Sequence, residues 1–205
     1  MLSLTSLIAV LIANLHLIFN NWGFAILALA LIVRFLLFPF QIFSFKQNKL
    51  LKKIQPEIDR LNSLHKENPL HLYRELGNLK KKEGIKTGLT LLSSMVQLPV
   101  FISIYRTFST LQSFAGQSFL WLTSLGGADP LFILPLLMMA SNYVQQKLNS
   151  QNAATANPQM QILTKLMPVL SFVFMMWLPS GLVLYYVASS SLQILGDVIL
   201  QRMTS

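Results

Sequence analysis

The sequence predicts an all-α membrane protein with five transmembrane helices, an outer interfacial helix before them, and a cytoplasmic helical hairpin after the first. Composition is the first support for this fold class. Of the 205 residues, 53% are hydrophobic and only 11% are charged, and the mean hydropathy is +0.54. A typical soluble domain has about 25% charged residues. So few charges cannot cover the apolar surface of a soluble protein, whereas a bilayer accommodates that surface.

The second support is a set of apolar segments that approach the roughly 20 residues needed to cross the hydrocarbon core as a helix. They are Trp22–Phe43, Gly88–Thr110, Leu131–Lys147, Ile162–Leu178 and Gly181–Ile199. Because open sheet edges are not tolerated in lipid, each segment is predicted to be a helix. The intervening segments are predicted to be an outer loop over 111–130, a cytoplasmic loop over 148–160 and a tail over 201–205.

Residues 1–20 are also apolar, but Asn14, His16, Asn20 and Asn21 interrupt or follow them. The segment lacks a basic start and a small-residue cleavage site, so we expect no removable signal peptide. We predict an interfacial helix on the outer surface that leads into the first span. The alternative is a sixth membrane span.

The third support is the uneven distribution of basic residues. The segment 46–86 holds 11 of the 16 basic residues. If it is cytoplasmic, Lys147, Lys165 and Arg202 lie on the same side, so 14 of 16 basic residues obey the positive-inside rule. The N-terminus is then outside and the C-terminus cytoplasmic. A net charge of +9 can also indicate nucleic-acid binding, but this basic block lies between apolar runs, so we expect no nucleic-acid function.

The segment 46–86 has a helical periodicity of its own. Apolar residues recur at helical spacing from Leu50 to Leu64 and from Leu72 to Leu79, with Asn68-Pro69 between the two runs. This pattern predicts an antiparallel helical hairpin in the cytoplasm. Its candidate recruitment residues are Lys46, Lys49, Lys52, Lys53, Lys80, Lys81 and Lys82. The alternative is a solvated loop that serves only topology.

Arg34 is the most informative residue. It lies about 18 Å along the first span from Trp22, near mid-membrane, where an arginine costs about 2.5–3.5 kcal/mol on insertion scales. No acidic residue occurs in another span near that depth, because Asp197 is close to the cytoplasmic end. A guanidinium without a buried ion-pair partner must contact water. Arg34 therefore predicts a water-filled cavity inside the bundle.

Two rows of polar residues are candidates for the walls of this cavity. Thr90, Ser93, Ser94 and Gln97 share one face of the second predicted span, and Tyr186, Ser190, Gln193 and Asp197 share one face of the last. The alternative for each row is helix–helix packing, which small hydroxyl residues favour in membranes. The unpaired Arg34 favours the cavity.

Signatures of enzymes are missing from the sequence. It has no phosphate-binding G-x-x-x-x-G-K-[ST] loop, no G-x-S-x-G elbow and no H-E-x-x-H zinc helix. It also contains no cysteine, so a thiolate metal site is excluded. We therefore expect no cofactor, no metal and no chemical reaction.

Four groups of motifs resemble the YidC/Oxa/Alb family of membrane protein insertases. They are Asn21-Trp22-Gly23-Phe24 with Ile32-Val33-Arg34, Gln97-Leu98-Pro99-Val100-Phe101 followed by Tyr105, Asp129-Pro130 with Phe132-Ile133-Leu134-Pro135, and Leu178-Pro179-Ser180-Gly181-Leu182-Val183-Leu184-Tyr185-Tyr186. They occur in the family's order over nearly the whole chain. The resemblance implies a bacterial inner-membrane protein of the short form, without a large outer domain, that inserts nascent membrane proteins without ATP.

The resemblance also implies that Arg34 and Gln97 line a hydrophilic groove open to the cytoplasm and the lipid, with substrate helices leaving along the second and fifth spans. Membrane lipids, a Sec-type translocon and the ribosome are further candidate partners. The sequence departs from the family at 85–88, before the second span, and at Ala30, where a hydroxyl is expected. Two alternatives from other classes are a small-anion transporter, with Arg34 binding the anion, and a passive assembly scaffold.

Overall fold

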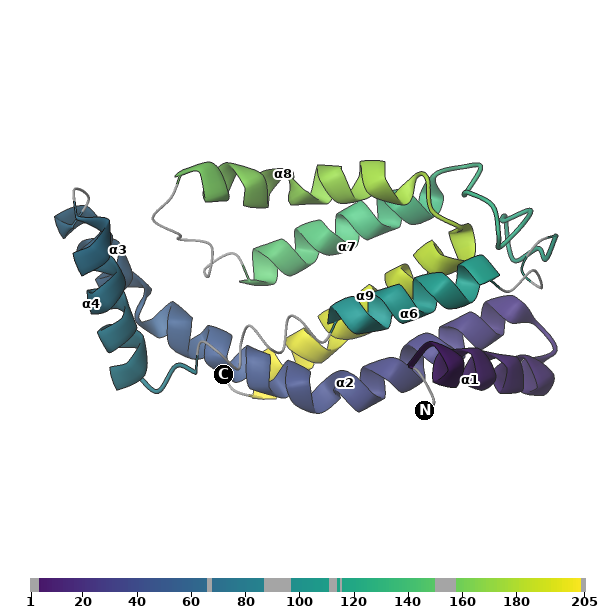
Figure 1. Ribbon diagram of the computed structural model, residues 1–205, viewed down its shortest axis with the longest axis horizontal. Helices are drawn as coiled ribbons and strands as arrows, with labels where there is room; N and C mark the ends of the chain where they lie inside the picture. The colour runs from purple at the N-terminus through teal and green to yellow at the C-terminus, as the bar shows by residue number, and fades with distance from the viewer. Residues whose placement is uncertain are drawn as a thin grey trace.

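The regular structure is helical throughout the residues that the computed structural model describes, which are 4–65, 68–86, 97–110, 114, 116–149 and 158–203 (Figure 1). The helices are α1 (Leu4–Phe19), α2 (Trp22–Lys53), α3 (Gln55–Leu64), α4 (Pro69–Lys82), α6 (Gln97–Thr110), α7 (Ile133–Asn149), α8 (Pro158–Met175) and α9 (Ser180–Met203). The one β-type pairing in these ranges is an isolated bridge between Phe119 and Leu122. The all-α fold class is therefore confirmed.

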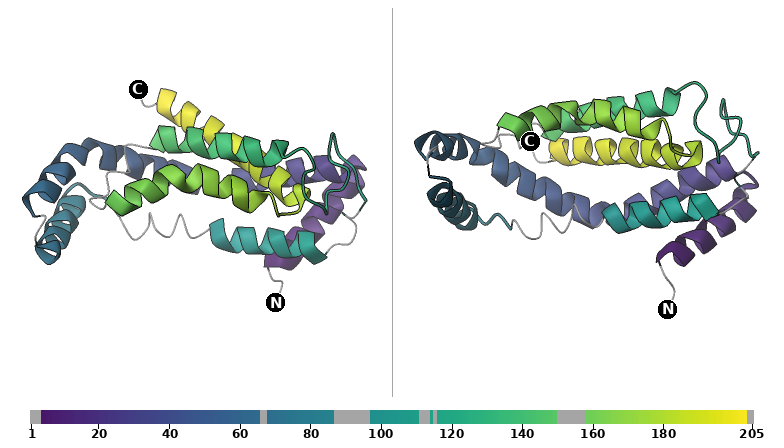
Figure 2. Two further views of the ribbon diagram at one scale, coloured as in Figure 1. Left: turned by 90° about the horizontal axis from the view of Figure 1, so that it is seen from above. Right: turned by 45° about the horizontal axis from the view of Figure 1, so that its top comes forward.

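Two helices, α2 and α9, are long and apolar enough to cross a membrane. They lie side by side and run in the same direction (Figures 1 and 2). α2 begins at a side-chain cap, because Asn21 Oδ1 accepts hydrogen bonds from the N–H groups of Gly23 at 2.8 Å and Phe24 at 3.2 Å. It continues to Lys53, ten residues beyond the end predicted for the first span, so its last turns carry lysines.

The other helices of the bundle pack around this pair. α7 lies between α9 and α8, while α1 packs against α2 and α6. Ile8, Ile12 and Leu15 form the buried face of α1, and the opposite face carries exposed apolar side chains. α1 is about 24 Å long at 1.5 Å per residue, which is shorter than the roughly 30 Å hydrocarbon core.

Aromatic rings close the end of the bundle at which α2 begins. Trp22 stacks on His16, with ring centroids 3.9 Å apart, and meets Phe114 edge-on at 4.8 Å. Phe114 in turn stacks on Phe108 of α6 at 4.5 Å. The backbone at the start of α9 is bonded to the same region, since Gly181 N–H donates to Leu125 O at 2.9 Å. These contacts join α1, α2, α6 and α9 into one rigid end.

Replacing Gly181 by alanine is expected to destabilise this end of the bundle. The added Cβ would lie 2.7 Å from the Phe108 ring and 3.1 Å from Leu125 O, a backbone atom that cannot move freely. Such overpacking typically costs about 1–3 kcal/mol, so the thermal unfolding temperature in detergent should fall. Gly77→Ala is the matched control, because nothing lies within 4 Å of a Cβ added there. Equal unfolding temperatures for the two variants would contradict the packing described here.

The remaining helices, α3 and α4, pack against each other at the far end of α2. Their apolar contact is formed by Ile54, Ile58, Leu79 and Ile85. Both helices run across the long axis of the molecule instead of along it (Figures 1 and 2). The end of this pair is held to α2, because buried Gln47 accepts a hydrogen bond from the Lys86 N–H at 2.9 Å.

Candidate functional site: a polar ladder between α2 and α9

Arg34 is held by uncharged partners on the neighbouring helix. Its Nε donates a hydrogen bond to Ser189 Oγ at 2.7 Å, and its Nη2 donates to Gln193 Oε1 at 2.8 Å. The side chain is half-buried. Among the described residues, no carboxylate lies within ion-pair distance of the guanidinium. The guanidinium of Arg34 is therefore bound by neutral polar groups of α9.

The polar contact continues along the two helices towards the Lys53 end of α2. Two turns after Arg34, Gln41 Nε2 donates to Gln193 O at 2.7 Å and to Asp197 Oδ1 at 2.9 Å. α2 and α9 run in the same direction, so the partners on α9 follow the same order. Arg34 bonds to Ser189 and Gln193, and Gln41, seven residues later, bonds to Gln193 and Asp197. We call Arg34, Gln41, Ser189, Gln193 and Asp197 the polar ladder.

Gly196 permits the close approach of the two helices at the ladder. A Cβ at this position would lie 2.6 Å from Gln41 Nε2. Ser189, Gln193 and Asp197 occupy one stripe of α9, and Gly196 leaves room beside it for the Gln41 amide. The ladder is thus built from backbone proximity as well as from side-chain hydrogen bonds.

A second set of hydrogen bonds joins α9 and α8 to α7. Gln145 Nε2 donates to Ser190 Oγ at 2.6 Å, and Asn142 Nδ2 donates to Ser171 Oγ at 2.8 Å. Ser189 and Ser190 are consecutive, so at this level α9 is bonded to α2 on one side and to α7 on the other. In both contacts the acceptor is the hydroxyl group of a serine that lies between two helices.

Two buried tyrosines precede the ladder on α9. Tyr185 is fully buried, and Tyr186 is 7% exposed and packs against Phe101 of α6 with ring centroids 5.4 Å apart. Within the part of the chain that the structure describes, the Tyr186 hydroxyl has no hydrogen-bond partner. Because a buried hydroxyl without a partner is costly, this part of the site has hydrogen-bonding capacity that the described residues leave unused.

The structure distributes the predicted site residues over several contacts. Gln193 and Asp197 join the ladder, Ser190 faces α7, and Tyr186 faces α6. Gln97 is the first described residue of α6, but its side chain lies outside the described set, as do Thr90, Ser93 and Ser94 entirely. The predicted recruitment lysines are at the surface, with Lys80 half-buried.

Sequence reasoning missed five residues of these contacts: Ser189, Gln41, Gln145, Asn142 and Ser171. A signal existed for two of them. Ser189 precedes Gln193 by one helical turn, and Gln41 follows Arg34 by two turns, so both share a face with a residue already selected. Gln145, Asn142 and Ser171 had no such signal, because no residue of α7 or α8 had been selected.

The chemistry of the site is hydrogen bonding and charge attraction. The described residues contain no group of three or more histidines, aspartates or glutamates that could hold a metal ion. A guanidinium has five N–H donors, and two of them are used by Ser189 and Gln193. The described residues leave three donors available to an acceptor such as water, a carbonyl oxygen or a carboxylate.

Comparison with known proteins places this fold in a family. The family model described as "60Kd inner membrane protein" matches residues 14–205. A protein of Pseudomonas savastanoi pv. phaseolicola named membrane protein insertase YidC is 32% identical over 193 residues, which cover 94% of this chain and 34% of that protein. One of the same name from Alcanivorax borkumensis is 35% identical over 184 residues, covering 89% of this chain and 31% of that protein.

A solved structure shows the same fold. The crystal structure described as "Active YidC insertase crystal structure with the first transmembrane domain resolved" superimposes with a TM-score of 0.67 at 23% identity, covering 91% of this chain and 44% of that one. This chain spans about a third of the length of the curated relatives that it matches. The apolar helices and these relatives indicate a bacterial inner-membrane protein. The chain belongs to the 60Kd inner membrane protein family.

Proposed function

We propose that this chain is a membrane protein insertase, which transfers segments of newly made membrane proteins from the cytoplasm into the bilayer without hydrolysing ATP. The relatives that carry this name support the class of activity. The observation that carries the mechanism is Arg34, a charge in the middle of a membrane helix that is held by the neutral side chains of Ser189 and Gln193.

The proposed topology has five spans. They are α2, the segment that ends in α6, then α7, α8 and α9, with α1 at the outer interface. The positive-inside rule places the lysine-rich end of α2 and the α3–α4 pair in the cytoplasm. The N-terminus is then outside, the C-terminus is cytoplasmic, and the aromatic end of the bundle around Trp22 closes the outer side.

In this topology the polar ladder forms one wall of a hydrophilic groove open to the cytoplasm and the lipid. Unsatisfied polar groups are rejected by hydrocarbon at a cost of several kcal/mol each. A groove that reaches Arg34, near mid-membrane, roughly halves the hydrocarbon that a substrate's polar flank must cross. The donors that Arg34 does not use on α9 would bind the carboxylate or carbonyl groups of that flank. Thr90, Ser93, Ser94 and Gln97 are proposed for the facing wall.

The driving force is the transfer of the substrate's apolar segment into lipid. Each buried CH₂ contributes about 0.8 kcal/mol, and a membrane helix contains tens of them. The membrane potential adds about 2.3 kcal/mol per charge per 100 mV. Together these terms replace nucleotide hydrolysis. The substrate helix would leave along α6 and α9. These two helices meet each other through aromatic side chains, such as Phe101 against Tyr186.

The lysines of α2 and α4 are proposed to recruit partners at the cytoplasmic side. The partners are nascent membrane proteins, with a Sec-type translocon and the ribosome as further candidates. These lysines are Lys46, Lys49, Lys52, Lys53, Lys80, Lys81 and Lys82.

The activity can be tested with the purified chain alone. In proteoliposomes without ATP, a small single-span substrate with a short acidic outer tail should become inserted, as measured by protection of its tail from added protease. Protein-free liposomes of the same composition are the control. Insertion no greater than in that control would refute the insertase and favour a passive scaffold. Efflux of small anions from the same vesicles would favour a transporter, and we expect none above background.

A further inference from the structure

In the proposed topology, the α3–α4 pair is expected close to the membrane surface and parallel to it. α2 is about 48 Å long, and its last eight residues, Lys46–Lys53, extend about 12 Å. The headgroup layer on each side of the hydrocarbon core is about 5–8 Å thick. From Ile54 onward the chain no longer follows the bundle axis, and α3 and α4 run across it (Figures 1 and 2). The length of α2 therefore places the pair within a few ångströms of the lipid headgroups.

α4 carries large apolar side chains that the described chain does not cover. Leu70 is 65% exposed and Tyr73 is 78% exposed. Leu76 and Leu79 of the same helix pack against α3. Leu70 and Tyr73 are not part of that contact and form a separate, exposed apolar surface. Exposed apolar side chains that gather on one face of a polar helix indicate a contact surface.

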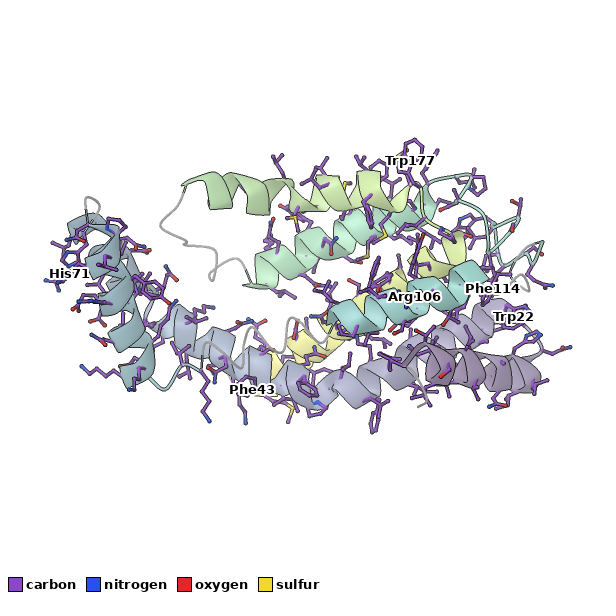
Figure 3. All side chains as sticks on the ribbon, in the orientation of Figure 1. Trp22, Phe43, His71, Arg106, Phe114 and Trp177 are labelled. Carbon is purple, nitrogen blue, oxygen red and sulfur yellow. The ribbon has the colours of Figure 1, made fainter. Side chains whose placement is uncertain are left out.

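This apolar surface lies on the side of α4 that faces back towards the bundle and the membrane. Figure 3 shows His71 on the opposite side, at the far end of the molecule. At about 100° per residue, Tyr73 is about 160° around the helix from His71, and Lys80 is about 180° from it. Leu70 and Gly77 are about 100° and 120° from His71, measured in the same direction around the helix as Tyr73.

Lysines surround the base of the pair. The segments 46–53 and 80–86 together contain eight lysines and one glutamate, a net charge of +7. The hydrogen bond from Lys86 N–H to Gln47 holds the two segments together. Lysine ammonium groups act as mobile point charges that suit phosphates of variable orientation. Near an anionic bilayer each basic residue contributes about 1 kcal/mol.

We propose that the α3–α4 pair binds the bilayer surface itself, with Leu70 and Tyr73 entering the interface and the lysines binding the phosphates of anionic lipids. Apolar and aromatic residues beside lysines on one helix are typical of interfacial helices, and tyrosine favours the headgroup level. Lipid is the expected occupant because the length of α2 and the crosswise direction of α4 place this face against the bilayer. The proposal depends on membrane placement and not on the insertion activity.

Site-specific labelling tests the proposal, because the chain contains no cysteine. Gly77→Cys and Asn78→Cys place an environment-sensitive fluorophore one residue apart, on the membrane-facing side and the outward side of α4. In the full-length chain, reconstituted into vesicles that contain phosphatidylglycerol, a lipid-borne nitroxide should quench the label at 77 at least about threefold more than at 78. Neutral lipids or 1 M salt, which shortens the Debye length to about 3 Å, should reduce the difference.

A double substitution separates lipid contact from folding. Leu70→Gln with Tyr73→Gln, in the Gly77→Cys background, should abolish the preferential quenching while leaving helix content unchanged, because both side chains are exposed. Equal quenching at 77 and 78 in anionic vesicles would overturn the proposal. Preferential quenching at 77 that survives the double substitution would also overturn the proposal. The same holds if the label at 77 leaves its aqueous environment only when a protein partner is added.

Discussion

Arg34→Ala should slow insertion of a single-span substrate with an acidic outer tail by about 10- to 100-fold. The guanidinium is the only cation of the polar ladder, and hydrogen bonds to charged groups are worth about 1.5–3 kcal/mol. Since about 1.4 kcal/mol corresponds to a factor of ten, losing one such bond to the substrate accounts for this range. The rate is measured by protease protection in proteoliposomes.

Two comparisons assign the effect to charge recognition. A substrate whose tail lacks acidic residues should depend less on Arg34. Arg34→Lys keeps the charge but loses the planar fork that reaches Ser189 and Gln193 together, so it should retain an intermediate rate. Because a charge within the bundle is costly, its removal should not unfold the protein. The unfolding temperature of Arg34→Ala should therefore not fall. Insertion of the acidic-tailed substrate by Arg34→Ala at the wild-type rate would exclude the electrostatic role.

Asp129→Ala should produce the largest loss of stability. Asp129 is 3% exposed, and its carboxylate accepts three hydrogen bonds. The donors are Trp121 Nε1 at 3.2 Å, Leu131 N–H at 3.1 Å and Leu134 N–H at 2.7 Å, the last two at the start of α7. A donor left without a partner costs about 1–3 kcal/mol when it is buried, so the loss of all three bonds should cost at least about 3 kcal/mol. Thermal unfolding in detergent measures it.

Asp129→Asn is the graded control for this prediction. The amide oxygen can still accept the bonds from Trp121 and Leu131, but the amide nitrogen then faces the Leu134 N–H, so one bond is lost. Its unfolding temperature should lie between those of the wild type and Asp129→Ala. If Asp129→Ala unfolds at the wild-type temperature, the carboxylate does not organise the start of α7.

The sequence predicted the parts of the fold that depend on local pattern. The apolar runs placed α2 and α9. Arg34 was selected because its burial cost is large whatever surrounds it. The sequence predicted bounds for the first membrane span but none for the helix that contains it, and backbone hydrogen bonding in α2 continues as far as Ile54.

The composition of the ladder could not be predicted, because it depends on helix rotation. The row Tyr186, Ser190 and Gln193 and the row Ser189, Gln193 and Asp197 are both consistent with helical spacing on α9. Only the long-range packing of α9 between α2 and α7 decides that Ser189 meets Arg34 while Ser190 meets Gln145. Gln41 shares a helical face with Arg34, but the sequence could not identify its partners, which are 152 and 156 residues away.

The proposed groove requires that water reaches the polar ladder within the membrane, and thiol reactivity measures this directly. Gln193→Cys lies on the ladder, and Leu195→Cys, two residues away, replaces a side chain that is 57% exposed on the apolar surface of α9. A thiolate forms in water and is suppressed in apolar surroundings. In proteoliposomes, a membrane-impermeant thiol reagent should modify the cysteine at 193 rapidly and the cysteine at 195 hardly at all. Equal, negligible modification at both positions would mean that Arg34 is enclosed in a dry interior, and the account would fail.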